Sequence, residues 1–400
     1  MVDETSTQSP IESSSRFLLD PYMDWAKDEG VPVHLDFGHD LLALETAPWK
    51  RFGARGCFAH THGRGDFMAN YVLEVEPGQK TGKIRHLYEA LFYVLAGSGS
   101  TVVWLPDGTT RTFEWGPKAM FAIPLNCPYQ IFNVSGLETT RLSCTNDAPL
   151  TINLYHNLDF VFDNPFHFSE RIGLSKHFDG EGDHSTMARK RKAGMLNVWE
   201  TNFVHDLTSF KLYELDARGK GSMNVVFVLA DGTMHAHSSE IPVGRYKKAH
   251  RHAAGTHVHA VDGSGYSLLW YDGDSEFVEL PWRHGFMYTP PFWMFHQHFN
   301  TCGKPARYLA CAIGSVRYPF ISLRQVSNAG GGSTSVKEGG RQIEYEDQDA
   351  RIHRKFLEEI ENSGVVSRMG DVFDEKAIME IPREKLAGVI QTPRLAGPPT

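Results

Sequence analysis

An internal repeat constrains the fold of this chain more than any other feature of its sequence. Residues 74–102 align with residues 240–268 at a constant offset of 166 positions and without a gap. The matched positions include Glu74 with Glu240, Gly78 with Gly244, His86 with His252, and residues 97–99 with residues 263–265. A duplicated unit fixes the domain organisation, and 400 residues suffice for two domains that each bury their own core.

Both copies continue as short β-branched and aromatic runs that are separated by turn signals. The pairs Asp107-Gly108 and Asp272-Gly273 lie between such runs, and Asp-Gly is a strong hairpin signal. No helical pattern alternates with these strands, which excludes a parallel α/β sheet. The sequence therefore predicts a mainly all-β protein built from two barrels, with short peripheral helices.

The repeat also suggests domain boundaries. We expect an N-terminal extension over residues 1–52, a first barrel over 53–158, an interdomain connection over 159–200, a second barrel over 201–325 and a C-terminal tail over 326–400. The connection carries a basic run at 189–192, interpreted as a solvated face, with a nuclear signal as the alternative. In the tail, a Gly/Ser-rich stretch precedes one amphipathic helix around Ile352, Phe356, Leu357 and Ile360, which Asp349 caps and Gly364 ends.

The composition of the chain limits the kinds of partner that it can bind. The net charge is -8 and the charged residues are scattered, so a nucleic-acid partner is not expected. No stretch of 18 consecutive apolar residues and no signal peptide is found, which predicts a soluble, cytoplasmic protein without a membrane partner. The five cysteines show no CxxC spacing and are interpreted as buried thiols in a reducing compartment.

Clustered histidines indicate metal chemistry in the second copy. His250 and His252 are two positions apart, a spacing that sends both rings to one face of a β-strand. A third ligand must come from a later strand, where His296 and His298 have the same spacing. We predict one divalent metal ion on His250, His252 and His296, with His298 beside the ion or as an alternative ligand.

These residues resemble the cupin superfamily, whose first motif is G-x5-H-x-H-x3-4-E-x6-G and whose second motif ends in H-x3-N. Gly244, His250, His252 and Gly263 match the first motif, and His296 with Asn300 matches the second. The glutamate is missing, because Thr256 occupies its position. The chain lacks this glutamate and carries Ala90-Leu91 in the first copy. In both respects it resembles gentisate 1,2-dioxygenase and its salicylate and hydroxynaphthoate relatives, which are bicupins with three histidine ligands.

The resemblance implies a cofactor and a reaction. It implies Fe(II), with Mn, Ni or Zn as alternatives, and a hydroxylated aromatic or enolic acid as substrate together with O2. Three neutral imidazoles leave the charge of the ion intact and three positions open, which suits a bidentate anion. The leading expectation is therefore a non-haem Fe(II) ring-cleaving dioxygenase of the extradiol type that works as a homo-oligomer.

Two further function classes stand beside this expectation. One is a metal cupin that catalyses a non-oxidative isomerisation, decarboxylation or lyase step on a small oxo or hydroxy acid. The other is a non-catalytic binding or storage bicupin, which would not need the complete histidine set. Metal analysis combined with oxygen uptake separates the first two classes.

We expect six further residues to lie around the ion. His257 and His259 follow the first pair closely and, with His298, are candidate acid/base or substrate-orienting groups, the alternative being simple packing. Tyr266 and Trp293 could line a pocket for a ring, although an aromatic residue in a barrel is first of all core. Arg245 is the candidate for a substrate carboxylate.

The first copy has lost this site. Ile84 stands opposite His250, and Tyr129 or Gln130 stands opposite His296, so that only His86 remains. One imidazole with a phenol or an amide cannot hold Fe(II) against water, and the first barrel is predicted to be free of metal and structural. The separate pair His60/His62 is interpreted as a loop near a subunit interface, with a metal site as the alternative.

Overall fold

Most of the regular structure in the described residues is β-sheet, arranged in two barrels. The structure is a computed structural model that describes residues 18–188, 195–320 and 333–393. The strands of the first half are β1 (Val33–Asp36), β2 (Gly38–Asp40), β3 (Ala47–Trp49), β4 (Ala54–Thr61), β5 (Ala69–Val75), β6 (Ala90–Ala96), β7 (Gly99–Trp104), β8 (Thr110–Trp115), β9 (Met120–Ile123), β10 (Tyr129–Asn133) and β11 (Thr140–Asn146). The expected mainly β fold class is confirmed.

The second half repeats this order of strands. They are β12 (Asp183–Ala188), β13 (Met195–Thr201), β14 (Phe203–Val204), β15 (Tyr213–Glu214), β16 (Met223–Leu229), β17 (Met234–Ile241), β18 (His257–Asp262), β19 (Gly265–Trp270), β20 (Val278–Trp282), β21 (Phe286–Tyr288), β22 (Phe295–Asn300) and β23 (Ala306–Ile313). The helices are short: α1 (Pro21–Asp28), α2 (Ala148–Tyr155), α3 (Leu158–Phe162), α5 (Ala350–Asn362) and α6 (Glu375–Glu380). None of the helices within the described ranges is long and apolar enough to cross a bilayer.

Each half forms a large sheet and a small sheet that face each other. In barrel 1 the large sheet runs β1-β4-β5-β11-β6-β9-β14 and the small sheet runs β10-β7-β8. In barrel 2 the corresponding orders are β12-β13-β16-β17-β23-β18-β21-β2 and β20-β19-β22. This mainly antiparallel arrangement is that of two jelly-roll, or double-stranded β-helix, barrels, as the repeat predicted.

A partly buried ion pair occurs at matching positions in the two barrels and supports the repeat. Arg141 on β11 contacts the Glu74 carboxylate at 2.5 Å, and Arg307 on β23 contacts the Glu240 carboxylate at 2.5 Å. Arg141 also donates to the carbonyl oxygen of Leu41 at 2.7 Å, and Arg307 to that of Leu207 at 2.8 Å. Each arginine therefore fixes an incoming loop to its sheet in the same way.

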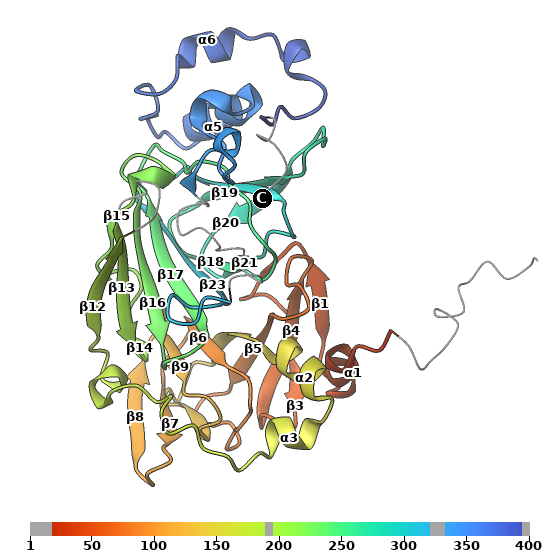
Figure 1. Cartoon of the computed structure of the whole chain (residues 1–400), viewed down its shortest axis with the longest axis vertical. Coiled ribbons are helices and arrows are strands. Elements are labelled where there is room, and N and C mark those ends of the chain that lie inside the picture. The colour runs from red at the N-terminus through yellow and green to blue at the C-terminus, as the bar shows by residue number, and fades with distance from the viewer. Residues whose placement is uncertain (1–17, 189–194, 321–332, 394–400) are drawn as a thin grey trace, which may run out of the picture.

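The two barrels exchange a strand. β14, which follows the connection in the chain, pairs with β9 of barrel 1, whereas β2 of the N-terminal segment pairs with β21 of barrel 2. Between the two large sheets lies a shared apolar core that includes Cys57, Leu91, Met234 and Leu309. Figure 1 shows the two barrels stacked along the long axis of the molecule.

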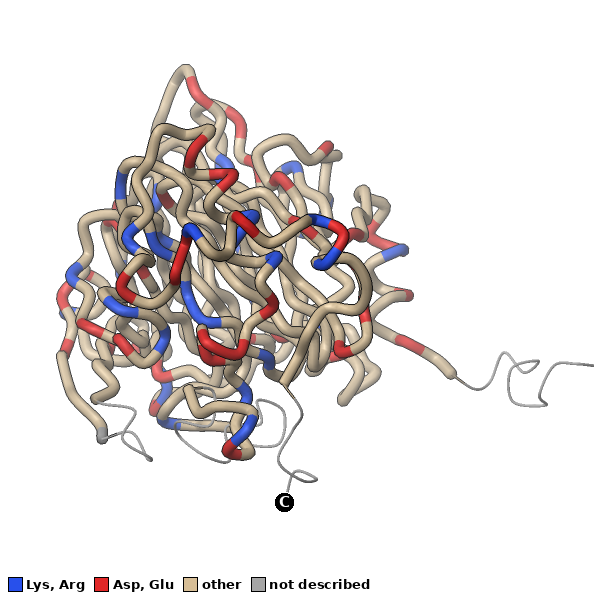
Figure 2. The backbone as a smooth tube through the Cα atoms, turned by 90° about the horizontal axis from the view of Figure 1, so that it is seen from above, with Lys and Arg blue, Asp and Glu red and all other residues tan. Residues whose placement is uncertain are grey.

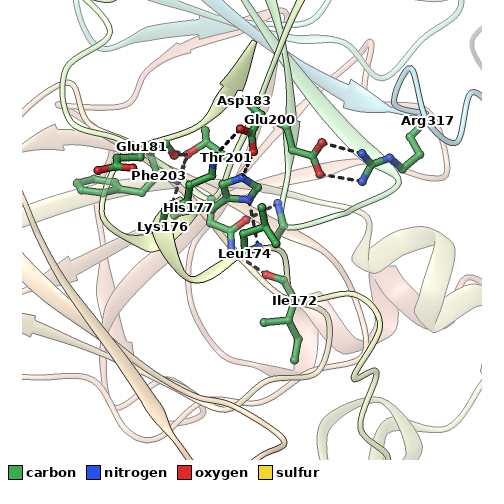
Figure 3. Close-up of polar contacts among 12 residues, drawn as sticks. Ile172, Leu174, Lys176, His177, Glu181, Asp183, Glu200, Thr201, Phe203 and Arg317 are labelled. Atoms are coloured by element: carbon green, nitrogen blue, oxygen red, sulfur yellow. Dashed lines mark hydrogen bonds and ion pairs between the residues drawn. The ribbon is translucent and has the colours of Figure 1, made fainter. Parts of the chain in front are cut away.

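The expected interdomain connection contains regular structure that belongs to barrel 2. β12 and β13 form a hairpin, and β13 pairs in parallel with β16. Figure 3 shows how this part is anchored: His177 Nε2 lies 3.0 Å from an Asp183 carboxylate oxygen, and Arg317 binds the Glu200 carboxylate at 2.7 and 2.9 Å. The basic run at 189–192 lies outside the described residues.

The amphipathic helix expected in the C-terminal tail is α5. Asp349 caps it by accepting a hydrogen bond from the backbone N–H of Arg351 at 2.9 Å, and Gly364 follows its end with a positive φ of 67°. Ile352, Phe356 and Ile360 are buried in a cluster with Tyr246 and Phe299 of barrel 2. The helix thus covers the small sheet of barrel 2 (Figure 1).

Charged residues of both signs are dispersed over the molecule. Figure 2 shows lysine and arginine segments interspersed with aspartate and glutamate segments along the described chain. Many of these charges form ion pairs, including Lys118 with Asp262 at 3.2 Å between the two barrels.

Candidate metal centre

Two backbone segments place the three predicted ligands side by side. His250 and His296 form an isolated antiparallel bridge, in which the N–H of each donates to the carbonyl oxygen of the other at 3.1 and 2.9 Å. His296 lies on β22, but His250 and His252 lie in an irregular segment after β17 rather than on the expected continuous strand. The bridge is nevertheless sufficient to bring the rings together.

The three imidazoles converge on a common point. One ring nitrogen from each of His250, His252 and His296 lies within 4.8 Å of the others. The ring centroids are 4.2 Å apart for His250 and His296, 4.6 Å for His252 and His296, and 5.6 Å for His250 and His252. In the described part of the chain, this is the cluster whose spacing suits a metal ion, and all of its members are histidines.

Backbone carbonyls orient two of the rings. The Nδ1 of His252 lies 2.7 Å from the carbonyl oxygen of Ala253, and the Nδ1 of His296 lies 3.2 Å from that of Met294. Because a carbonyl oxygen can only accept, Nδ1 carries the proton and Nε2 keeps a lone pair. Such an outer hydrogen bond is the usual companion of a metal-bound histidine, so the donor set fits a divalent ion.

Burial keeps two of the three predicted ligands neutral. Desolvation, followed by the positive charge of Arg218 and by the neighbouring histidines, holds the pKa of His250 well below its ordinary value. Desolvation and the charges of His252 and His298 do the same to the pKa of His296. The His250 Nδ1 atom is buried and has no hydrogen-bond partner among the described residues. Neutral, desolvated imidazoles are poised to bind a cation rather than a proton.

His298 lies next to the trio inside the barrel. Its ring centroid is 5.6 Å from that of His296 and 6.2 Å from that of His250. Its Nδ1 lies 2.7 Å from the hydroxyl of Tyr288 and 3.0 Å from that of Ser267. This hydrogen-bonded arrangement fixes the ring beside the proposed ion.

Sequence reasoning missed a buried lysine and its tyrosine partner in the same barrel. Lys247 is 2% exposed, and its Nζ donates to the hydroxyl of Tyr308 at 3.1 Å. Burial opposes ionisation of Tyr308, but the charge of Lys247 and hydrogen bonds with Ser239 and Lys247 outweigh it, so the pKa of Tyr308 lies below its ordinary value. The Tyr308 ring is 5.3 Å from that of His298.

His257 and His259 occupy a different place from the one expected. They lie on β18, but their side chains are directed to the interface between the barrels rather than to the trio. The Nε2 of His259 lies 2.9 Å from the hydroxyl of Ser143 of barrel 1, and its ring is 5.6 Å from that of Tyr93. Their neighbours Val258 and Ala260 take the opposite, barrel-lining face.

Arg245 and Tyr266 also lie away from the trio. Arg245 binds the carboxylate of Asp371 in the C-terminal tail at 2.9 and 3.1 Å. Tyr266 stacks on Phe299 with ring centroids 4.5 Å apart, and Lys355 of α5 lies over its ring. Both residues therefore hold the C-terminal tail against the barrel, and neither is placed to bind a substrate at the ion.

Trp293 remains close to the predicted ligands. Its backbone N–H donates to the carbonyl oxygen of His252 at 3.0 Å, and it adopts a positive φ of 63°. Arg251 and Arg341 lie over its ring at 5.2 and 5.3 Å from the centroid. Arg251 points outward, as the alternation of side chains predicted, and its guanidinium binds Asp272 at 2.8 Å.

A hydrogen bond stands in place of the metal site in barrel 1. The bridge between Ile84 and Tyr129 matches the bridge between His250 and His296, which identifies Tyr129, not Gln130, as the counterpart of His296. The Nε2 of His86 lies 2.9 Å from the Tyr129 hydroxyl, and Tyr88 stacks on the His86 ring at 3.7 Å. Desolvation lowers the pKa of His86 to about 4.

The pair His60/His62 does not form a joint site. His60 is buried, and its Nε2 lies 2.8 Å from the hydroxyl of Tyr22 on α1. Desolvation, with smaller effects from Arg64 and His257, lowers the pKa of His60 to about 3. The ring of His62 contacts Phe37 instead, at 4.9 Å between centroids.

Comparison with known proteins gives a distant structural likeness. No protein-family model matches the chain, and no curated protein matches its sequence. Among solved structures, the Bacillus subtilis oxalate decarboxylase studied for its Mn(II) centres has 13% identity and a TM-score of 0.45, with 70% of this chain and 78% of that chain covered. A deletion mutant of the same enzyme has 14% identity and a TM-score of 0.44 over the same shares. Similarity at this level says nothing about the ion or the substrate of this chain.

Proposed function

We propose that barrel 2 binds one divalent metal ion on His250, His252 and His296 and uses it to convert a small organic acid. The observation that carries this proposal is the convergence of three imidazoles within 4.8 Å, of which those of His250 and His296 are buried and have a lowered pKa. When bound, the ion supplies Lewis-acid or redox chemistry at its open positions. The donor set admits Fe(II), Mn, Ni or Zn.

The charges around the trio favour an anionic substrate. The ligand set contains no carboxylate, so the double charge of a bound ion is not neutralised by its ligands. Lys247 and Arg218 add positive charge, and both depress the pKa of His298 after desolvation, which is the main cause. A carboxylate beside a hydroxyl or oxo group is the substrate chemistry that this environment selects.

The hydrogen-bonded groups beside the trio favour a non-oxidative reaction. The hydroxyl of Tyr308, held by Lys247 at 3.1 Å, is an acid/base group with a lowered pKa inside the barrel. His298, Tyr288 and Ser267 form a connected route for a proton next to the ligands. Decarboxylation or isomerisation of an oxo or hydroxy acid needs such proton transfer at carbon or oxygen. This reaction class is our first candidate.

Ring cleavage of a hydroxylated aromatic acid by an Fe(II) dioxygenase is the second candidate. It is favoured by the ligand set itself, because three histidines leave positions for a chelating substrate and for O2 on the same ion. The aromatic residues Trp282 and Tyr288 lie beside His298, at 5.4 and 6.0 Å between ring centroids. They supply flat apolar surface for a ring.

One experiment separates the two candidates. The protein is purified without oxygen, its metal content is determined, and the holoenzyme is incubated with a panel of hydroxylated aromatic acids and of short oxo and hydroxy acids. Substrate conversion in the absence of O2, with CO2 or an isomer as product, supports the first candidate. Consumption of one O2 per substrate supports the second, and protein that binds no divalent ion contradicts both.

A further inference from the structure

Barrel 1 carries a cleft, and none of the residues that line it takes part in the proposed reaction. Its volume is about 430 Å³, within the range of small-molecule sites. Three cationic side chains line it, Arg51, Lys83 and Arg85, and its apolar lining includes Phe52, Ile84 and Phe162. The cleft therefore combines positive charge with apolar surface.

The position of this cleft in the repeat is informative. Ile84 is the residue that replaces His250, and Arg85 and Arg251 are matched in the same alignment. The cleft thus lies beside the segment of barrel 1 that corresponds to the segment of His250 and His252 in barrel 2. The hydrogen bond between His86 and Tyr129 occupies the position that corresponds to the trio, and neither residue lines the cleft.

The charges in the cleft leave room for one anionic group. Arg51 is matched by Glu29, at 2.5 Å, and its guanidinium lies over the Phe162 ring at 4.1 Å. Lys83 lies over the Trp104 ring at 4.0 Å, and within the described ranges it makes no ion pair. The buried Arg85 Nε has no hydrogen-bond partner among the described residues.

Asp163 also lines the cleft, and its negative charge balances one of the two positive charges of Lys83 and Arg85. A single positive charge is left over, beside apolar side chains. This balance suits a monoanion with an apolar body better than a phosphate dianion, which would need further donors.

We propose that this cleft is a second, non-catalytic binding site for a small carboxylic acid with a compact apolar body, of the benzoate type. Arg85 and Lys83 bind the carboxylate, and Phe162 and Pro128, the partly exposed apolar residues of the lining, contact the body. The site is independent of the ion, because none of its lining residues belongs to barrel 2.

Isothermal titration calorimetry with benzoate tests this proposal. The titrated protein is the full chain carrying His296→Ala and treated with a chelator, so that failure of the metal proposal does not affect the result. We expect one benzoate per chain and affinity weakened about tenfold by Arg85→Gln, because a charge-assisted hydrogen bond is lost. Lys83→Gln should weaken binding by about threefold, since Lys83 is exposed and its charge is screened.

The controls test separately the carboxylate of the ligand, its apolar body and the specificity for the cleft. Lys80→Gln removes an exposed lysine of the same barrel, whose Nζ lies over Phe132 outside the cleft, and should leave benzoate binding unchanged. Acetate and benzyl alcohol, which keep only the charge or only the body, should both bind at least about tenfold more weakly. Equal binding of benzoate to the parent, Arg85→Gln and Lys83→Gln proteins, or tighter binding of inorganic phosphate, would overturn the proposal. Circular dichroism confirms that each variant is folded.

Discussion

The two barrels share one framework but differ in what fills it. Asn133 in barrel 1 donates to the carbonyl oxygens of Val75 and Glu138, and Asn300 in barrel 2 donates to those of Ile241 and Lys304. Inside, three apolar residues of barrel 1 correspond to polar residues of barrel 2: Leu73 to Ser239, Ile131 to His298 and Leu142 to Tyr308. The position of Lys247 is taken by Thr81, which carries no charge. The barrel fold thus needs its framework contacts but not the histidine trio.

The largest effect is expected from removal of one ligand in barrel 2. His296→Ala should weaken metal binding by more than about 100-fold, because even an outer-shell partner contributes 10- to 100-fold. Metal analysis after dialysis should show near-complete loss of the ion. Tyr129→Phe, the matched change in barrel 1, should leave the ion content unaltered. Full metal content in His296→Ala would break the comparison.

Restoring the ligands in barrel 1 should create a second site. His86 is already present, and the bridge between Ile84 and Tyr129 reproduces the backbone of the ligand pair in barrel 2. The variant with Ile84→His, Tyr129→His and Tyr88→Ala, which clears the ring stacked on His86, should raise metal content from one ion per chain to two. Its control is Ile84→His alone. A folded triple variant that still holds one ion would show that the framework is insufficient.

The framework arginines should contribute equally in the two barrels. Arg141→Met and Arg307→Met each remove an ion pair and two hydrogen bonds to loop carbonyls. Each should lower the free energy of unfolding by about 2–3 kcal/mol, less than for a fully buried pair because both side chains are partly exposed. Chemical denaturation measures the two losses. A clear inequality would mean that one barrel depends less on its loop.

Acid should destabilise the fold through its buried neutral histidines. Burial lowers the pKa of His86 to about 4 in the folded protein, below the ordinary value of 6.5. Between these values the unfolded chain binds more protons, so the free energy of unfolding falls as pH decreases. For His86 alone the loss from pH 7 to pH 5 is about 2 kcal/mol.

Denaturation of metal-free protein at the two pH values checks this prediction. His86→Gln should reduce the difference in unfolding free energy by about the same amount, because glutamine does not titrate. An unchanged pH dependence in this variant would assign the effect to other buried histidines, such as His257, whose pKa desolvation also lowers to about 4.

Local sequence patterns were sufficient for the repeat, the barrels and the convergence of the ligands. The hairpin signals, the spacing of His250 and His252, and the cap at Asp349 all depend on neighbouring residues. The face of β18 could not be inferred in this way. Alternation puts His257 and His259 on one face, but only contact with Ser143, 116 residues earlier, shows that this face meets the other barrel.

Irregular backbone and distant partners explain the other differences. Lys247 is an odd number of residues from His250, so on a regular strand its side chain would point outward. The segment is not a regular strand, and the Lys247 side chain reaches Tyr308 inside the barrel. The sequence suggests that Arg245 binds a substrate carboxylate, but its partner in the structure is Asp371, which lies 126 residues away in the tail. The exchanged strands β2 and β14 are too short to show any periodicity.

That exchange means that neither half of the molecule is complete by itself. Cutting the chain at 189–194 would separate β14 from β9 and β2 from β21, leaving an unpaired sheet edge on each fragment and uncovering the shared core. Two such fragments, expressed together, should recognise each other and rebuild one particle, whereas either expressed alone should aggregate. The two halves of the chain thus behave as the two subunits of a covalently linked dimer.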